Sequence, residues 1–422
     1  MNKKCIPHGW KNVHLKDVCE KIADRNHITP TYVKEGCPLI SPTNFINHLD
    51  IDFENCKRIS LEDLEIERKK CDPKKGDLLF SRIGTVGLVR KVNTDKLFVP
   101  LHSIAQIRVD NTKASTEFIY QWLGSPLMKK QIRDSVQSIG VPDIGIAKIQ
   151  NFRMDLPESL DEQDKIAFIL STVDETIEST DKIIETYSRL KKSMLNKLLT
   201  KGFDTKKFKK VEYRTHKYME IPEHWEWTTL GKYTRPESGS TPSKRIPEYY
   251  TGSIPWVTTV DLNYGWITKP TEYITNEAVK SAHLTIHPKG TFLIAITGLE
   301  AAGTRGRCGI LDIDATTSQS CIAFETGEQV LPEFLFYWYQ CFSHSIIFQL
   351  AQGTKQQSLN INIVRDILIA LPPIVEQKKI IEIMKQLDKT LQINKEKKVG
   401  SIKMKKSLMQ KLLSGEMRVK VN

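Results

Sequence analysis

The sequence lacks any apolar run long enough to cross a membrane. A membrane-spanning helix needs roughly 18 to 20 predominantly apolar residues, and no stretch of the 422 residues approaches that length. The opening residues, MNKKCIPHGW, also lack the apolar segment of a secretory signal peptide. These two absences predict a cytoplasmic protein that has no membrane partner.

The sequence is also poor in patterns that hold metals or form disulfides. Its eight cysteines are scattered and none belongs to a Cys-x-x-Cys pair, so in a long chain without a secretion signal we expect reduced thiols. His283 and His287 have the spacing of a zinc pair on a helix, but they precede a predicted strand and lack the glutamate of a metalloprotease motif. We therefore expect no metal site.

Recognisable catalytic motifs are missing as well. No glycine-rich loop ending in Gly-Lys-Ser or Gly-Lys-Thr is present to hold a nucleotide phosphate. A DNA methyltransferase needs an Asp or Asn followed by two prolines and an aromatic residue, whereas Leu371–Ile374 has the sequence LPPI. Glu67 and Lys69 are residue types that nucleases use, but they stand isolated in the sequence. The sequence predicts a chain without a catalytic site, which binds no cofactor itself.

The charge balance favours a polyanionic partner. The chain has 62 Lys and Arg against 50 Asp and Glu, a formal net charge of +12. Basic side chains that neutralise phosphates release counterions, and this release favours binding to nucleic acid. Many basic proteins bind no nucleic acid, so the charge alone does not establish such a partner.

An internal repeat organises the chain. At 422 residues the chain exceeds what a single hydrophobic core supports, so two or more domains are expected. Four landmarks recur at a spacing of 215 or 214 residues: Ile6–Trp10 (IPHGW) and Ile221–Trp225 (IPEHW), Leu156-Pro157 and Leu371-Pro372, Glu162-Gln163 and Glu376-Gln377, and Lys192–Leu199 (KSMLNKLL) and Lys406–Leu413 (KSLMQKLL). The segments between the landmarks diverge, which indicates one scaffold that carries two different recognition surfaces.

The periodicity between the landmarks predicts a mixed α/β fold. Residues 76–110 and 289–325 alternate apolar and polar positions around glycine-rich turns, as strands and hairpins do. Residues 115–132 and 331–350 have the pattern of short helices. Each half of the chain is therefore expected to form one α/β domain.

A long helical pattern follows each Leu-Pro landmark. In the first pattern, apolar residues recur from Ile166 to Leu198 at steps of three and four. The second begins at Ile380 and ends at Leu412, and we expect a stutter or bend near Gly400. A narrow apolar seam needs a helical partner, so we expect the two helices to pack as an antiparallel coiled-coil spacer. The alternative is that each helix packs only on its own domain.

The landmarks resemble those of the specificity subunits of Type I restriction–modification systems. Three motifs carry the resemblance and each occurs twice: Ile-Pro-x-x-Trp followed by Leu15 or Leu230, a Leu-Pro segment leading to Glu-Gln-x-x-Ile, and the closing Lys-Ser-x-x-x-Lys-Leu-Leu. Residues 237–262 also resemble the family's usual run after the first motif. The first half departs from it, with residues 29–45 as the nearest equivalent. The resemblance covers nearly the whole chain.

The resemblance implies what the chain does and with which partners. Each variable region would be a target-recognition domain that binds one half of a bipartite, asymmetric site in double-stranded DNA. The helices would set the gap between the half-sites and dock modification (methyltransferase) subunits. Those subunits would methylate adenine with S-adenosylmethionine, and a separate restriction subunit would cleave DNA with ATP and Mg²⁺.

The repeat and the resemblance together predict five parts. The boundaries between the parts are placed at the landmarks. The connector between the halves has seven Lys and Arg and no apolar periodicity, so we expect this connector to be exposed and solvated. The parts are target-recognition domain 1 (1–157), a central helical spacer (158–200), a linker (201–217), target-recognition domain 2 (218–373) and a C-terminal helical spacer (374–415).

Hydrogen-bonding side chains on loops between strands are the candidates for contact with DNA. Such loops can enter a groove, while basic residues around them hold the phosphates. The candidates are Arg82, Thr85, His102, Ser103 and Lys148 in the first domain, and Arg305, Arg307, Gln319, Lys355 and Gln356 in the second. We expect Gln319-Ser320 to correspond to His102-Ser103. For each candidate, a solvated turn or a phosphate contact competes with base recognition.

Trp10 and Trp225 could stack on bases, but their repeated position predicts a structural role in packing. Two other functions remain open from the sequence. One is a stand-alone DNA-binding regulator, and the other is a single-chain nuclease or methyltransferase with an unrecognised site.

Overall fold

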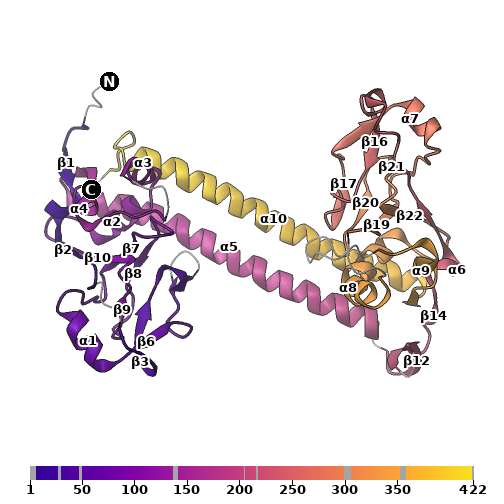
Figure 1. Ribbon diagram of the computed structural model, residues 1–422, viewed down its shortest axis with the longest axis horizontal. Helices are drawn as coiled ribbons and strands as arrows, with labels where there is room; N and C mark the ends of the chain where they lie inside the picture. Colours follow the sequence, from indigo (N-terminus) through magenta and orange to yellow (C-terminus); the bar gives the residue numbers. More distant parts are fainter. Residues whose placement is uncertain are drawn as a thin grey trace. The chain divides into compact units, whose positions relative to one another are not determined.

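The chain forms two compact units in the computed structural model (Figure 1). Unit 1 comprises residues 1–183 and 394–422, and unit 2 comprises residues 184–393. The structure describes residues 6–26, 30–46, 50–135, 141–203, 205–214, 217–298, 306–351 and 358–420. Unit 1 thus takes in the last part of the sequence, while unit 2 is one continuous segment.

Unit 1 is built on a four-stranded antiparallel sheet in the order β2-β10-β7-β8. Its strands are β2 (Cys19–Ala23), β7 (Leu78–Ser81), β8 (Val89–Lys91) and β10 (Ile104–Val109). Successive side chains of a strand point to opposite faces of the sheet. Leu78 and Phe80 accordingly pack in the main core with the helices, whereas Leu79 packs on the other side with Ile40 and Phe98.

Helices cover one face of this sheet and a second sheet lies on the other. The side chain of Ser115 caps α2 by accepting a hydrogen bond from the backbone N–H of Phe118 (3.4 Å). Phe118 and Trp122 of α2 are buried in the main core. The covering helices include α2 (Thr116–Leu123), α3 (Pro126–Ser135) and α4 (Ile146–Gln150). The second sheet contains β3 (Tyr32–Ile40), β6 (Lys57–Ile59) and β9 (Val99–Pro100), and α1 (Leu61–Arg68) packs on this second sheet.

Unit 2 repeats this arrangement. Its main sheet has the order β15-β22-β19-β20-β17, and its smaller sheet has the order β18-β16-β21. The strands are β15 (Thr234–Ser238), β16 (Ile254–Val257), β17 (Gly265–Ile267), β18 (Glu272–Ile274), β19 (Phe292–Ala295), β20 (Cys308–Leu311), β21 (Thr316–Thr317) and β22 (Cys321–Thr326). The helices are α6 (Leu230–Tyr233), α7 (Asn276–Ser281), α8 (Pro332–Leu350) and α9 (Ile361–Arg365). The strands and helices predicted from periodicity are therefore confirmed, with α8 a single 19-residue helix.

The same two-stranded frame closes each domain. In unit 1, β1 (Trp10–His14) pairs antiparallel with β11 (Arg153–Pro157). In unit 2, β14 (Glu226–Thr229) pairs antiparallel with β23 (Leu368–Leu371). The strand at the opening motif thus lies beside the strand that leads into the long helix, which explains why both landmarks recur at one spacing.

A buried glutamine anchors the start of each long helix, α5 (Leu160–Lys201) and α10 (Ile374–Leu412). Gln377 is completely buried; its Nε2 donates to the carbonyl groups of Pro372 (2.9 Å) and Gln329 (2.8 Å), and its Oε1 accepts from the N–H of Leu331 (2.9 Å). Gln163 makes the equivalent bonds to the carbonyl of Pro157 (2.7 Å) and the N–H of Ser115 (2.7 Å). Each glutamine therefore ties the first turn of its helix to loops of its own domain.

Within each unit, segments of the two long helices run antiparallel (Figure 1). In unit 1, Nζ of Lys405 on α10 contacts both carboxylate oxygens of Asp174 on α5 (2.5 and 2.7 Å). In unit 2, Nζ of Lys191 on α5 contacts Asp388 on α10 (2.5 Å). The residues of one ion pair lie 214 positions from those of the other, so the same pair occurs twice with the two helices exchanged.

The end of each long helix packs on an opening motif. Gly202 and Gly415 follow the helices with φ values of 62° and 70°, a conformation that favours glycine. A Cβ on Gly202 would lie 3.1 Å from the ring of Trp225, and a Cβ on Gly415 would lie 2.4 Å from Pro7. Trp10 and Trp225 are only 6% and 1% exposed, which confirms their predicted structural role.

One expectation from the sequence is corrected. The expected connector at 201–217 contains β12 (Phe208–Arg214), which forms an antiparallel hairpin with β13 (Lys217–Pro222). Val211 and Ile221 of this hairpin are buried beside Trp225, and lysines at the exposed positions hid the alternation. The helix α10 is continuous through Gly400, and the stutter or bend expected there stays a prediction. Within the described ranges, no helix combines the length and apolar character needed to span a membrane.

Replacing Gln377 by alanine should destabilise unit 2. The change leaves buried backbone groups without a partner, at a cost of about 1–3 kcal/mol for each such group, so we expect the free energy of unfolding to fall by about 3 kcal/mol. Hydrogen exchange measured by mass spectrometry should quicken around Gln329 and Leu331. Gln386→Ala, at an exposed position of the same helix, is the control, and equal exchange in the two variants would contradict the anchoring role.

Candidate nucleic-acid interface

Three candidate segments of unit 1 meet at one end of the four-stranded sheet. The N–H of Arg82, just after β7, donates to the carbonyl of Ser103 (2.8 Å), in the loop before β10. The N–H of Gly84 donates to the carbonyl of Pro142 (2.9 Å), and the N–H of Ile144 donates to the carbonyl of Arg82 (2.9 Å). Residues 82–87, 102–103 and 141–148 thus form one continuous edge, which we call the loop edge of unit 1.

Arg82 lies beneath this loop edge. Its side chain is 4% exposed, its Nη2 donates to Asp24 (2.7 Å), and its Nη1 donates to Asp143 (2.8 Å). A guanidinium held by two carboxylates can pair with a base only if it first gives up these bonds. Arg82 was expected to contact DNA, and the structure corrects this expectation. Its side chain lies beneath the loops, where it holds them in position, and not on their surface.

Asp24 keeps its charge in this setting. Burial raises the pKa of Asp24, but the hydrogen bond from Lys70 (3.1 Å) and the charge of Arg82 outweigh it, so that pKa lies below its ordinary value. Asp24 is therefore ionised at neutral pH, where it accepts the hydrogen bond from Arg82. The sequence did not single out Asp24, because no motif links it to an arginine 58 residues later.

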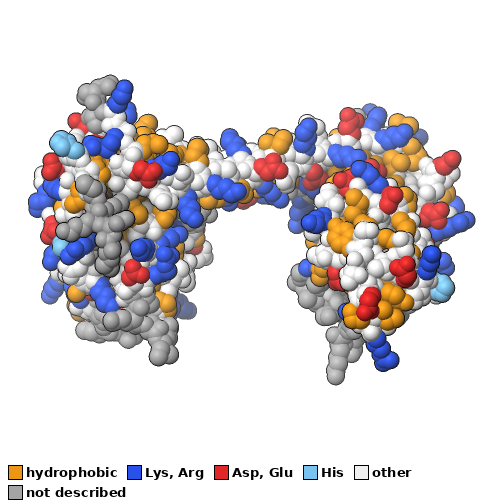
Figure 2. All heavy atoms as spheres, turned by 90° about the horizontal axis from the view of Figure 1, so that it is seen from above, with side chains coloured by type: hydrophobic (Ala, Val, Ile, Leu, Met, Phe, Trp, Pro, Cys, Tyr) orange, Lys and Arg blue, Asp and Glu red, His pale blue; other side chains and the backbone are white. Residues whose placement is uncertain are grey.

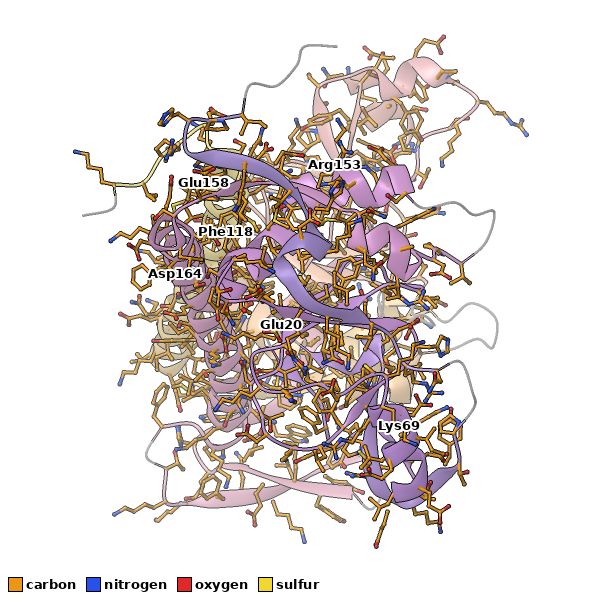
Figure 3. The ribbon with its side chains drawn as sticks, turned by 90° about the vertical axis from the view of Figure 1, so that its left-hand side faces the viewer. Glu20, Lys69, Phe118, Arg153, Glu158 and Asp164 are labelled. Carbon is orange, nitrogen blue, oxygen red and sulfur yellow. The ribbon has the colours of Figure 1, made fainter. Side chains whose placement is uncertain are left out.

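The nuclease-like pair noted in the sequence does not form an acid–lysine site. Glu67 is buried and accepts a hydrogen bond from the N–H of Asn26 (3.0 Å). Lys69 is exposed after the end of α1, as Figure 3 shows from the side of unit 1. Glu67 therefore supports a loop.

The other candidates of unit 1 differ in exposure. Thr85 is exposed in the glycine-rich turn, His102 is half-buried, and Ser103 is buried. Lys148 is half-buried, and its Nζ donates to the carbonyl of Ser135 (2.8 Å), which joins α4 to the end of α3. Thr85 is the candidate most open to a large ligand.

Unit 2 forms the same loop edge from different residues. The N–H of Ile296 donates to the carbonyl of Ser320 (3.0 Å), as Arg82 does to Ser103 in unit 1. This bond confirms that Gln319-Ser320 corresponds to His102-Ser103. Ile296 is 7% exposed, so an apolar side chain occupies the position at which unit 1 has its buried arginine.

The candidates of unit 2 are described in part. Gln319 is exposed, and Arg307 is half-buried with its Nη1 donating to the carbonyl of Thr259 (3.2 Å). Arg305, Lys355 and Gln356 lie outside the described residues.

The described surface carries charges of both signs, and burial keeps two thiols of unit 1 protonated. On the face shown in Figure 2, Lys and Arg side chains are spread over both units and mixed with Asp and Glu. Burial raises the pKa of the Cys19 and Cys71 thiols to about 12, so both are neutral thiols and poor nucleophiles. Within the described ranges, no three His, Cys, Asp or Glu side chains gather as a metal site would require.

Both halves of the chain match one protein family. Residues 7–187 and 222–402 match the Type I restriction modification DNA specificity domain. Each matched segment begins at the proline of an opening motif and runs into a long helix. The two matched segments therefore coincide with the two copies of the internal repeat.

Similar proteins cover most of the chain. A putative type I restriction enzyme MjaX specificity subunit from Methanocaldococcus jannaschii is 28% identical, over 98% of this chain and 95% of that protein. The type I restriction enzyme MjaVIII specificity subunit from the same organism is 27% identical, over 75% of this chain and 74% of its own length. The solved S subunit of a Type-I restriction-modification system from M. genitalium shares the fold, with a TM-score of 0.60 at 17% identity over 98% of this chain and 97% of that one. This chain belongs to the family of Type I restriction–modification DNA specificity subunits.

Proposed function

We propose that this chain selects the DNA sequence on which a Type I restriction–modification complex acts, each domain recognising one half of a bipartite site. The supporting observation is that one scaffold occurs twice and has different side chains at its loop edge. Where unit 1 has half-buried His102 at its loop edge, unit 2 has exposed Gln319 at the equivalent position. Different side chains in the same place would recognise different bases, so the site is asymmetric.

The proposed DNA contacts lie on the two loop edges. Thr85, exposed in unit 1, and Gln319, exposed in unit 2, are the proposed base contacts, since a glutamine can pair with an adenine edge. Arg307 can pair with guanine, and Lys148 is a proposed phosphate contact. His102, Ser103, Arg305, Lys355 and Gln356 remain candidates on the same loop edges.

The two long helices would act as an antiparallel coiled-coil spacer between the domains. The repeated ion pair and the buried seam support this role. The 42 residues of α5 give a rod of about 60 Å at about 1.5 Å per residue, which is long enough to set a gap between two half-sites. In this proposal the recognition domains are residues 1–157 and 218–373, and the spacers are 158–200 and 374–415, joined through 201–217.

Catalysis would belong to partner subunits. Modification subunits docked on the helices would methylate adenine with S-adenosylmethionine, which requires the base to be flipped out of the duplex. A restriction subunit would use ATP and Mg²⁺. The role of this chain is then to hold the duplex in register and in a bent or opened form.

Exchanging one recognition domain should change one half of the methylated motif. We expect this for residues 215–373 replaced by the variable region of another specificity subunit, because each loop edge belongs to a separate unit. Methylation-sensitive sequencing of host DNA, with the gene present, deleted or exchanged, measures the motif. A change in both halves, or in neither, would contradict independent recognition.

The purified chain should bind DNA weakly by itself and more tightly with the modification subunit. The described loop edges offer few exposed cations, so contacts with phosphates must come largely from the partner. A gel-shift titration at fixed salt measures both affinities. Full affinity without a partner would instead indicate a stand-alone regulator. Cleavage or methyl transfer by the chain alone, with Mg²⁺ and labelled methyl donor, would reveal a catalytic site.

The variants Arg82→Ala and Thr85→Ala should distinguish a residue that positions the loops from a residue that contacts DNA. Removing one member of a buried ion pair costs about 3–5 kcal/mol, so Arg82→Ala should lower the free energy of unfolding of unit 1 by about 3 kcal/mol in urea. Thr85→Ala should change it by less than about 0.5 kcal/mol and relax the preference at one base pair. If Arg82→Ala kept full stability and lost only specificity, Arg82 would be a DNA contact.

A further inference from the structure

Two equivalent stripes on the long helices carry opposite charge. Their spacing of three and four residues places the members of each stripe on one face of a helix. The two stripes are related by the same offset of 214 residues that relates Gln163 to Gln377. The unit 1 stripe on α5 is Asp164, Phe168, Ser171 and Glu175, and the unit 2 stripe on α10 is Lys378, Glu382, Lys385 and Lys389.

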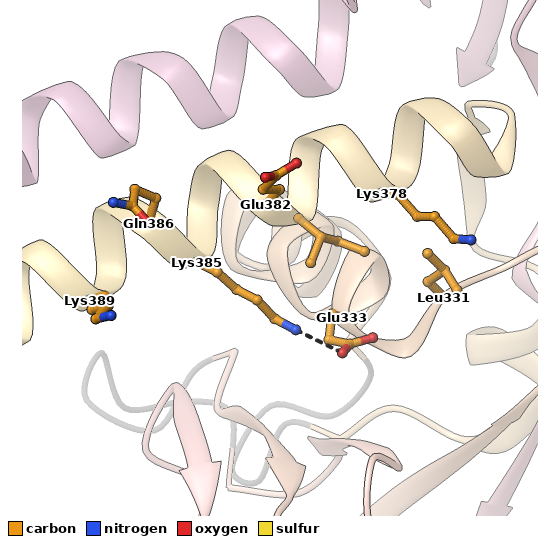
Figure 4. A pocket seen from close by; sticks show the side chains of 8 residues that line it. Leu331, Glu333, Lys378, Glu382, Lys385, Gln386 and Lys389 are labelled. Atoms are coloured by element: carbon orange, nitrogen blue, oxygen red, sulfur yellow. Dashed lines mark hydrogen bonds and ion pairs between the residues drawn. The ribbon is translucent and has the colours of Figure 1, made fainter.

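The unit 2 stripe borders an open groove between α10 and the start of α8 (Figure 4). The groove has a volume of about 500 Å³. Lys385 is engaged inside unit 2, since its Nζ donates to Glu333 (3.1 Å) and lies 5.5 Å from the ring centre of Trp266. Lys378 and Lys389 are exposed on the rim, and neither forms an ion pair with a described residue. Besides the Lys385–Glu333 pair, the groove therefore presents Lys378, Lys389 and the exposed Glu382 to a partner, which is an excess of one positive charge.

The unit 1 stripe carries negative charge and an exposed aromatic side chain. Phe168 is 67% exposed, although the neighbouring face of the same helix is buried at Ile166, Leu170 and Val173. Asp164, at the periphery of unit 1 in Figure 3, is exposed on one side of Phe168. Glu175 is exposed on the other side. Phe168 therefore stands between two exposed carboxylates on this face of the helix, and the stripe has a net charge of −2.

We infer that two identical copies of the modification subunit dock on these two stripes with unequal affinity, and that the tighter, more salt-dependent docking is on the lysine stripe of unit 2. This inference rests on the proposed function, in which both helical regions dock such subunits. One partner surface cannot complement two stripes of opposite charge, because like charges that face each other across an interface oppose binding. The lysine stripe adds a groove to its charge, and both features suit an acidic, protruding partner surface.

The test measures the two stepwise dissociation constants of the full chain with its modification subunit by mass photometry. We expect them to differ by about tenfold at low ionic strength. They should converge as salt is added, because exposed charges are screened.

Charge exchange between the stripes identifies which docking site is which. Lys378→Asp with Lys389→Glu gives the unit 2 stripe the charges of unit 1 and should weaken the tighter constant about tenfold, to the level of the weaker one. Asp164→Lys with Glu175→Lys does the reverse and should strengthen the weaker constant. Lys397→Glu with Lys403→Glu makes the same change in net charge at exposed positions of α10 outside the stripe and should leave both constants unchanged. The four stripe positions that are exchanged, Asp164, Glu175, Lys378 and Lys389, are exposed. Thermal unfolding verifies that each variant is folded.

Three results would overturn the inference. Equal constants for the unaltered chain would do so, and so would a tighter site that responds to Asp164 and Glu175 instead of the lysines. A loss of affinity in the Lys397 and Lys403 control equal to that of the stripe variant would show that net charge alone is responsible. Failure of any complex to form, by contrast, would overturn the proposed function, and this inference with it.

Discussion

Each domain of this chain depends on a helix end that belongs to the other half of the sequence. Met409, Leu412 and Leu413 pack in the main core of unit 1, and Leu195, Leu198 and Leu199 do the same in unit 2. Burying a leucine or methionine side chain contributes roughly 1.5–3 kcal/mol, so neither core is complete without its borrowed helix. This dependence explains why the closing motif recurs, since its apolar residues belong to the cores and its lysines are exposed.

A rigid frame leaves the loop edges free to vary. The paired strands β1–β11 and β14–β23, together with the buried glutamines, fix where each domain begins and ends. The loops at the end of the sheet then share a backbone hydrogen bond in the two units, although the buried side chains beneath them differ. Arg82 and Ile296 show the result, because a buried ion pair and a buried apolar side chain support the same backbone geometry.

The sequence predicted the frame better than the site. The opening tryptophans, the long helices and the sheet strands follow from periodicity and repetition, which are local or regularly spaced signals. Arg82 was misplaced because an arginine between glycine-rich strands resembles a groove contact, and its buried partner Asp24 lies in a distant segment. The hairpin at 208–222 was missed because lysines occupy its exposed positions, so a real alternation looked like a charged connector.

The division of the chain has a consequence for how the protein is made. Unit 2 is one continuous segment, residues 184–393, whereas unit 1 needs residues 394–422 as well as the first 183. During synthesis on the ribosome, unit 2 can therefore complete its core before Met409 and Leu412, which the core of unit 1 requires, have been added to the chain. The usual order of domain folding, from the N-terminus onward, is reversed, and the domain synthesised first keeps part of its apolar surface uncovered for the longest time.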